Sequence, residues 1–88
     1  MKIITLNGEK MREKTAAFGY LARKFGLDPD VKNLDALYDA LGEINEPTRI
    51  NLKNHSALAS LGDYGDDLIA VFTDLAEENE RVKFEILS

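Results

Sequence analysis

Three segments of strand character alternate with helical segments along this chain, and that order restricts the folds open to it. Residues 2–6 form a β-branched run, and apolar residues alternate with polar ones in residues 49–53 and 82–86. Helical patterns separate these strands, so neighbouring strands are expected to run parallel. A length of 88 residues suffices for one domain and is too short for two. The sequence predicts an α/β fold: a small single domain, residues 1–88, with a three-stranded parallel sheet packed with about four helices.

The clearest helical signal lies in residues 66–79. Apolar residues recur there at the i, i+3, i+4 and i+7 positions of one helix face, namely Leu68, Val71, Phe72 and Leu75. Asp66 and Asp67 fall in the expected first turn, where the helix dipole favours negative charge. The preceding residues 62–65 include two glycines and are typical of a loop. We therefore expect a loop followed by an amphipathic helix.

Three further helical segments are predicted between the strands. Residues 13–25 carry apolar side chains at helical spacing, and Gly26 provides a C-terminal stop. Residues 33–41, NLDALYDAL, begin with a favourable N-cap, and residues 55–61 allow one or two helical turns. The inner side of the 33–41 helix is expected to carry Leu34, Leu37, Tyr38 and Leu41. Of these, Tyr38 either packs in the core or presents its hydroxyl at the edge of a binding face.

The negative charge of the chain is concentrated in two acidic blocks. The net charge is −5, yet residues 63–80 hold seven acidic residues and no basic one, and residues 28–46 hold six acidic residues and one lysine. Acidic surfaces repel nucleic acid and anionic lipid, so direct binding to nucleic acid or to a membrane is not expected. A basic partner is the natural complement of such blocks, although ordinary solubility also explains them.

The residue types of common catalytic and metal sites are scarce. The chain has no cysteine and one histidine, His55, so Cys/His and Ser/His/Asp constellations are not predicted. Residues 28–33 resemble the start of an EF-hand loop, but Lys32 and Asn33 occupy the positions that need a ligand and a glycine. We therefore expect a protein that is not an enzyme, with no cofactor and no metal site.

The predicted helix at residues 33–41 carries its acidic residues against local preference. Asp35, Asp39 and Glu43 follow one another at four-residue steps, so on a helix they would share one face. Like charges at this spacing cost a few tenths of a kcal/mol. The helix dipole compensates Asp35 near the helix start, but not Asp39. A residue choice that opposes local structure is expected at functional sites, while a solvated helix face would show the same pattern.

The stretch NLDALYDAL also resembles the signature of the barstar family, small intracellular inhibitors of secreted microbial ribonucleases. Its most specific residues are Asn33, Asp35, Ala36, Leu37 and Asp39. Residues 4–9 are similar to the first strand and turn of that family, and residues 84–88 to its last strand. The resemblance covers nearly the whole chain, and it implies a three-stranded parallel sheet with helices, in agreement with the pattern analysis.

The resemblance also implies which residues bind the partner. In the family, the helix matching residues 33–41 and the loop before it block the active site of the ribonuclease. Asp39 would take the place of a substrate phosphate, and Asp35 would bind beside it. An acidic residue of the last helix adds a contact, for which Asp74 and then Glu78 are the expected counterparts. Tyr38, Asp30 and Glu43 complete the set of expected partner-binding residues.

The chain departs from the family pattern in the loop at residues 27–32. This loop lacks the aromatic residues and the glycine that family members commonly carry, and it is one residue shorter. Tyr38 stands where a tryptophan is often found, and Lys32 adds a positive charge that would face a basic cleft. Ribonuclease inhibition in general is therefore better supported than tight inhibition of the family's best-known target.

From the sequence we expect an inhibitor that binds one basic, barnase-type microbial ribonuclease and is a monomer when free. The alternative is a non-catalytic interaction or regulatory domain that uses the same scaffold for a different basic partner. No apolar run reaches the length of a membrane span, and residues 1–10 do not resemble a signal peptide. A cytoplasmic location is the corresponding expectation.

Overall fold

The three predicted strands form one parallel sheet in the order β1-β2-β3. The computed structural model describes all residues from Met1 to Ser88. The strands are β1 (Lys2–Asn7), β2 (Thr48–Lys53) and β3 (Val82–Ile86), and the helices are α1 (Lys14–Phe25), α2 (Leu34–Leu41) and α3 (Asp63–Glu78). The 3₁₀ segments η1 (Gly8–Lys10) and η2 (His55–Leu61) follow β1 and β2. The predicted α/β class and parallel sheet are confirmed.

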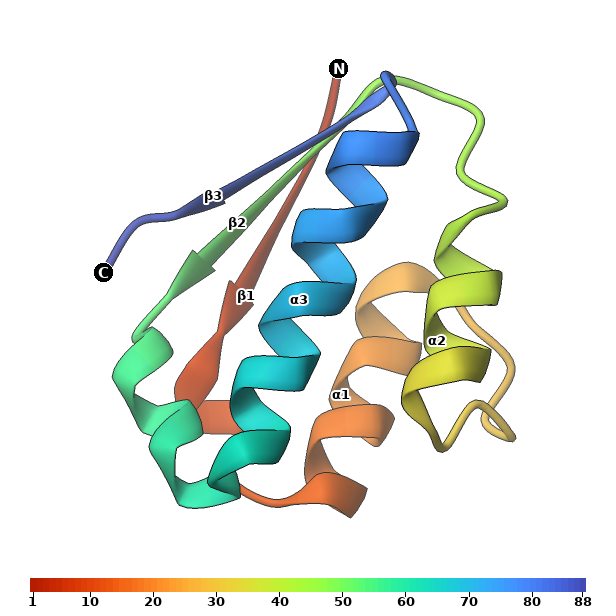
Figure 1. Cartoon of the computed structure of the whole chain (residues 1–88). Coiled ribbons are helices and arrows are strands. Elements are labelled where there is room, and N and C mark those ends of the chain that lie inside the picture. Colours follow the sequence, from red (N-terminus) through yellow and green to blue (C-terminus); the bar gives the residue numbers. More distant parts are fainter.

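All three α-helices lie on one side of the sheet (Figure 1), and the hydrophobic core fills the space between them and the strands. The period-two pattern of the strands turns alternate side chains toward that core. The buried strand residues are Ile4, Leu6, Thr48, Ile50, Leu52 and Val82, and the buried helix residues include Phe18, Leu21, Leu37, Leu41, Leu68, Val71, Phe72 and Leu75. The apolar helix faces predicted from the sequence are therefore the ones that pack.

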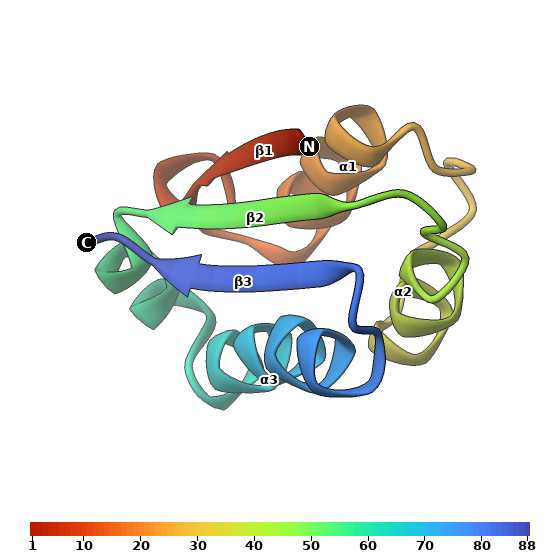
Figure 2. The same ribbon diagram turned by 90° about the horizontal axis from the view of Figure 1, so that it is seen from above.

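The opposite face of the sheet is left open, although parallel sheets are usually covered on both faces. Ile3 on this face is 62% exposed, and Arg49 pairs there with Glu85 at 3.1 Å. β3 buries its predicted apolar face only in part. Val82 is buried, Phe84 is half-buried and Ile86 is 42% exposed. The reason is its position at the edge of the sheet, which Figure 2 shows from above.

The structure corrects the loop predicted for residues 62–65. α3 begins at Asp63, and Gly65 is a buried residue of its first turn. A Cβ atom on Gly65 would lie 2.5 Å from the carbonyl oxygen of Leu58, so glycine is needed where η2 and α3 touch. The early start places Asp63 and Asp66 in the first turn and leaves Asp67 for the second. Gly65 therefore marks a close contact between η2 and α3, and not a loop between them.

None of the helices combines the length and apolar character that a membrane span requires.

Candidate functional site

α2 presents two of the predicted residues, Asp35 and Asp39, to solvent. The helix starts after Asn33, whose side-chain oxygen accepts a hydrogen bond of 2.8 Å from the N–H of Ala36. Leu37 and Leu41 are completely buried and fix the inner side of the helix to the core. Asp35 and Asp39 are exposed and lie one helical turn apart on the outer side. The two carboxylates are thus carried by a helix whose inner side is anchored in the hydrophobic core.

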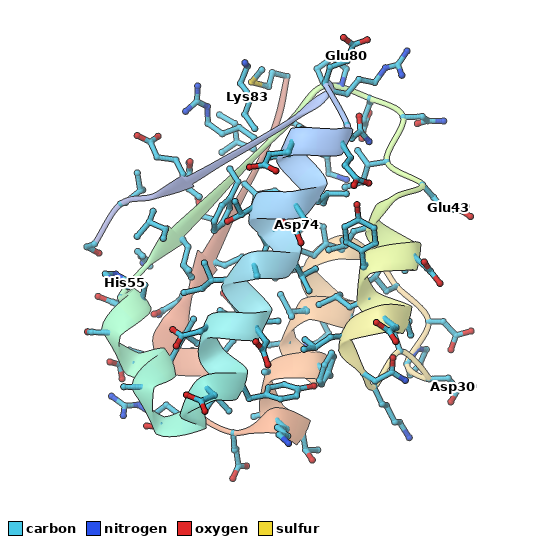
Figure 3. The ribbon with its side chains drawn as sticks, viewed as in Figure 1. Asp30, Glu43, His55, Asp74, Glu80 and Lys83 are labelled. Carbon is cyan, nitrogen blue, oxygen red and sulfur yellow. The ribbon has the colours of Figure 1, made fainter.

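Glu43 and Asp30 lie beyond opposite ends of α2, away from Asp74 on α3 (Figure 3). The helix ends at Leu41, and the N–H of Glu43 donates to the carbonyl oxygen of Ala40 at 3.3 Å in the turn that follows. The expected helical ridge therefore holds two acidic residues and not three. Asp30 stands in the loop before the helix, where its N–H donates to the Asp28 carboxylate at 2.8 Å.

Tyr38 links α2 to α3. Its ring is half-buried against the core, and its hydroxyl donates a hydrogen bond of 2.5 Å to the Glu78 carboxylate. This hydrogen bond, together with desolvation and the charges of Glu78, Asp74 and Asp39, raises the pKa of Tyr38 to about 12. Of the two positions expected for Tyr38, the structure shows the one in which the hydroxyl reaches the surface.

Three acidic residues of α3 form a stripe along one side of the helix, and the C-terminal end of this stripe lies beside the Tyr38 hydroxyl. Asp74 and Glu78 are exposed and one turn apart, and Asp67 lies two turns before Asp74 on the same side of the helix. Asp74 and Glu78 both contribute to the raised pKa of Tyr38, as does Asp39 from α2. The structure therefore brings four of the predicted residues together around one hydroxyl, namely Tyr38, Asp39, Asp74 and Glu78.

An open groove of about 640 Å³ separates the C-terminal ends of α2 and α3. The amide of Asn79 closes one side of it by donating to the carbonyl oxygen of Ile44 at 3.1 Å. The groove is lined by Tyr38, Gly42, Ile44, Leu75, Glu77, Glu78, Asn79, Glu80 and Arg81. It is rimmed by carboxylates with one guanidinium group, and such a rim favours a cationic group of a partner.

Sequence reasoning missed Asp67 and the aromatic residue one turn before it. Tyr64 packs edge-on against Phe18 of α1 at 6.3 Å, and the Lys14 amine lies 4.2 Å from the centre of its ring. Burial, followed by the charge of Asp67, raises the pKa of Tyr64. The seven-residue spacing between Asp67 and Asp74 was a signal for this stripe. The contact between Tyr64 and Lys14 had no local signal, because it joins different helices.

His55, the one histidine, lies on η2, away from α2 (Figure 3). Its Nδ1 atom is 2.5 Å from the main-chain oxygen of Ser88, so the ring holds the end of the chain. No group of three or more histidine, aspartate or glutamate side chains is arranged to hold a metal ion.

The fold and this surface define a class of protein: a small parallel α/β domain that carries acidic residues on two packed, exposed helix faces. Comparison with known protein families gives a match over residues 1–88 to the barstar family, described as barnase inhibitors. The chain belongs to the barstar family, which is a family of inhibitors and not of enzymes. The resemblance seen in residues 33–41 is confirmed. Comparison with individual curated proteins gives no significant match.

Proposed function

We propose that this protein inhibits a basic, secreted barnase-type ribonuclease by inserting α2 and the loop before it into the active site. The observation that carries the proposal is the hydrogen bond between Tyr38 and Glu78. It joins the acidic residues of α2 and α3 into one surface, although the two residues are 40 positions apart in the chain. Asp39, Asp74 and Glu78 all lie close enough to the Tyr38 hydroxyl to raise its pKa.

Electrostatics explain how this surface would block a ribonuclease. An active site that stabilises RNA phosphates is a cationic cleft. Asp39 would occupy the place of one phosphate, with Asp35 beside it and Asp74 or Glu78 in contact from α3. These carboxylates repel one another in the free protein, and a cationic partner would relieve that repulsion. The acidic surface would also speed association at low salt.

The scaffold supports such a role because the acidic residues need little reordering. α2 is capped by Asn33 and anchored by two completely buried leucines. The loop before it is held by Leu27 and Val31, which pack against the core, and by a 3.1 Å hydrogen bond from the Val31 N–H to the carbonyl oxygen of Asp28. Groups already fixed in position lose less conformational entropy when they bind.

A basic corner beside this loop bears on which ribonuclease is recognised. Lys14 and Lys32 line one cavity of about 340 Å³ between α1 and the loop, together with Thr15, Phe18, Gly19 and Pro29. Two lysines at the border of the proposed surface would oppose a uniformly basic partner. We infer that these two lysines weaken binding to a ribonuclease whose cleft is basic opposite residues 29–32. Because the barstar family consists of intracellular inhibitors, we also infer that inhibition takes place inside the cell.

Titration calorimetry against a barnase-type ribonuclease at two salt concentrations tests the proposal. We expect nanomolar or tighter binding of one inhibitor per enzyme, with an affinity that falls as salt rises. Absence of binding at both salt concentrations would separate the scaffold from this partner. It would leave a non-catalytic interaction or regulatory domain for a different basic partner.

A further inference from the structure

The outer edge of β3 offers unpaired backbone groups to a second strand. The N–H of Thr48 donates to the carbonyl oxygen of Arg81, and the N–H of Leu87 donates to that of Leu52, both at 2.8 Å. In a parallel ladder these two bonds place the odd-numbered residues of β3 toward β2. The N–H and C=O groups of Phe84 and Ile86 therefore point to the free edge. The carbonyl of Val82 does so too, while its N–H donates to Asn79 at 2.9 Å.

An apolar groove runs beside this edge. It has a volume of about 490 Å³ and lies between β3 and α3, lined by Thr73, Ala76, Glu77, Phe84, Glu85 and Ile86. Ile86 is 42% exposed and Phe84 is half-buried, so apolar surface continues from the groove onto the strand. Exposed edges of this kind are templates for pairing with another chain.

The sequence of β3 is complementary to itself. We propose that β3 pairs antiparallel with β3 of a second copy of this protein, across a two-fold axis beside Phe84. In this register the two Phe84 residues exchange both hydrogen bonds, and each Ile86 N–H donates to the Val82 carbonyl of the other copy. Lys83 then stands directly opposite Glu85 of the other copy, at the closer, non-hydrogen-bonded pairs of the ladder.

Both side-chain faces fit this register. Lys83 and Glu85 lie on the open face of the sheet, and Figure 3 shows Lys83 on the side of β3 away from α3. On the helix side, the exposed Ile86 and the half-buried Phe84 of the second copy come to lie beside the groove between β3 and α3. The same patch serves both copies, so the contact closes as a dimer and does not continue into a fibre.

The other edge of the sheet is less suited to pairing. On β1, the N–H of Asn7 already donates to the Tyr20 hydroxyl at 3.0 Å, so α1 occupies one end of that edge. Residues 2–7 also contain one lysine and no acidic residue, so they offer no opposite-charge pair to a second copy. The choice of β3 therefore rests on both backbone availability and charge.

Two features limit the strength of the dimer. Glu77 lines the groove from α3, so two like charges approach one another across the axis. Each copy also carries a net charge of −5. We therefore expect dimers only at high micromolar to millimolar protein, and the monomer expected from the sequence below that range. The acidic surface remains free, because β3 and α2 lie on different sides of α3 (Figure 1).

Sedimentation equilibrium of the full chain over a concentration series tests the proposal. The expected result is a rise from the monomer mass of 9.8 kDa toward twice that value. Hydrogen exchange of the Phe84 and Ile86 amides should slow as the protein concentration rises. The amides of Lys83 and Glu85 donate toward β2, so they should be protected at every concentration. A monomer mass up to millimolar protein would overturn the proposal.

Three variants separate this contact from any other. Ile86→Pro removes an outward-facing donor without removing a bond to β2, and it should abolish the dimer. Lys83→Glu places like charges opposite one another and should weaken the dimer about tenfold. The swap Lys83→Glu with Glu85→Lys should restore the parental affinity. A dimer that survives Ile86→Pro, or a swap that fails to restore pairing in a folded protein, would refute this register.

Discussion

The Tyr38 hydroxyl donates a hydrogen bond to the Glu78 carboxylate across the contact between α2 and α3. Glu78 is the last residue of α3, and Tyr38 lies beside Asp39 on α2. This contact joins the two acidic helices at the surface, above the buried leucines that hold α2 and α3 against the core. The proposed binding surface depends on that position, since it combines carboxylates from both helices.

Asp39→Ala should remove most of the inhibition and leave the fold intact. Truncating one member of a buried interfacial charge pair costs roughly 2–5 kcal/mol, a range to which complexes of this family themselves contribute. The free protein should be as stable as the parent or slightly more so, because a like charge next to Asp35 is removed. Calorimetry against the ribonuclease and a thermal melt measure the two effects.

Asp66→Ala is the matched control for this change. It removes the same charge from an exposed position in the first turn of α3, outside the proposed surface. Its affinity should stay within a small factor of the parent. If Asp39→Ala inhibits as well as Asp66→Ala does, Asp39 does not take the place of a phosphate.

The alkaline stability of the protein should depend on the contact between Tyr38 and Glu78. The pKa of Tyr38 is raised from 10.0 to about 12 in the folded state, so between these values the folded protein binds more protons than the unfolded chain. Stability from this group is therefore complete below pH 10 and is lost as the pH rises toward 12. Unfolding in denaturant across this pH range should show the decline.

Glu78→Gln isolates that effect. The neutral amide removes the charge that contributes to the raised pKa, so the pKa of Tyr38 should fall toward 10.0. Ultraviolet titration of the phenol groups, with Tyr38→Phe to assign the signal, measures it. An unchanged Tyr38 titration in Glu78→Gln would mean that the hydrogen bond is not formed in solution.

Gly65→Ala should destabilise the protein by about 1–3 kcal/mol, as overpacking does in a close contact. The added Cβ would lie 2.5 Å from the Leu58 carbonyl oxygen, so η2 and α3 would have to separate. Gly19→Ala is the control, since its Cβ would meet only the end of the Arg23 side chain at 3.7 Å. That change should stabilise α1 by about 0.5–1 kcal/mol. Chemical denaturation compares the two, and equal effects would contradict this packing.

Local signals in the sequence were sufficient for the elements but not for the contacts between them. Asn33 caps α2 and Gly26 ends α1 in a left-handed conformation, as predicted, because both roles depend on the residue and its neighbours. Gly65 was misread as a loop residue because the group that requires a glycine there, the Leu58 carbonyl, belongs to another element. The position of Tyr38 could not be chosen from the sequence for the same reason, because its partner Glu78 belongs to another helix. Asp35 and Asp39 were predicted as partner-binding residues because their spacing opposes local helix preference and because they match the family signature, whereas Asp67 lies at an ordinary position of an acidic helix.

Lys32→Ala should strengthen binding to a basic ribonuclease by several-fold. Lys32 and Lys14 line one cavity beside the loop that precedes α2, so a cation is removed where the proposed surface meets a cationic cleft. Because charges at the rim of an interface act mainly on association, the gain should appear in the on-rate and shrink as salt rises. Stopped-flow association at two salt concentrations measures it.

Lys53→Ala provides the comparison for Lys32→Ala, because it removes an equal charge from the exposed end of β2, far from α2 in Figure 1. Long-range attraction would rise equally in both variants, so only the excess in Lys32→Ala reports on the loop. Equal rates for the two variants would place residues 29–32 outside the interface. Slower association of Lys32→Ala would instead show that this lysine meets an acidic group of the target, and the loop would then be a determinant of which ribonuclease is bound.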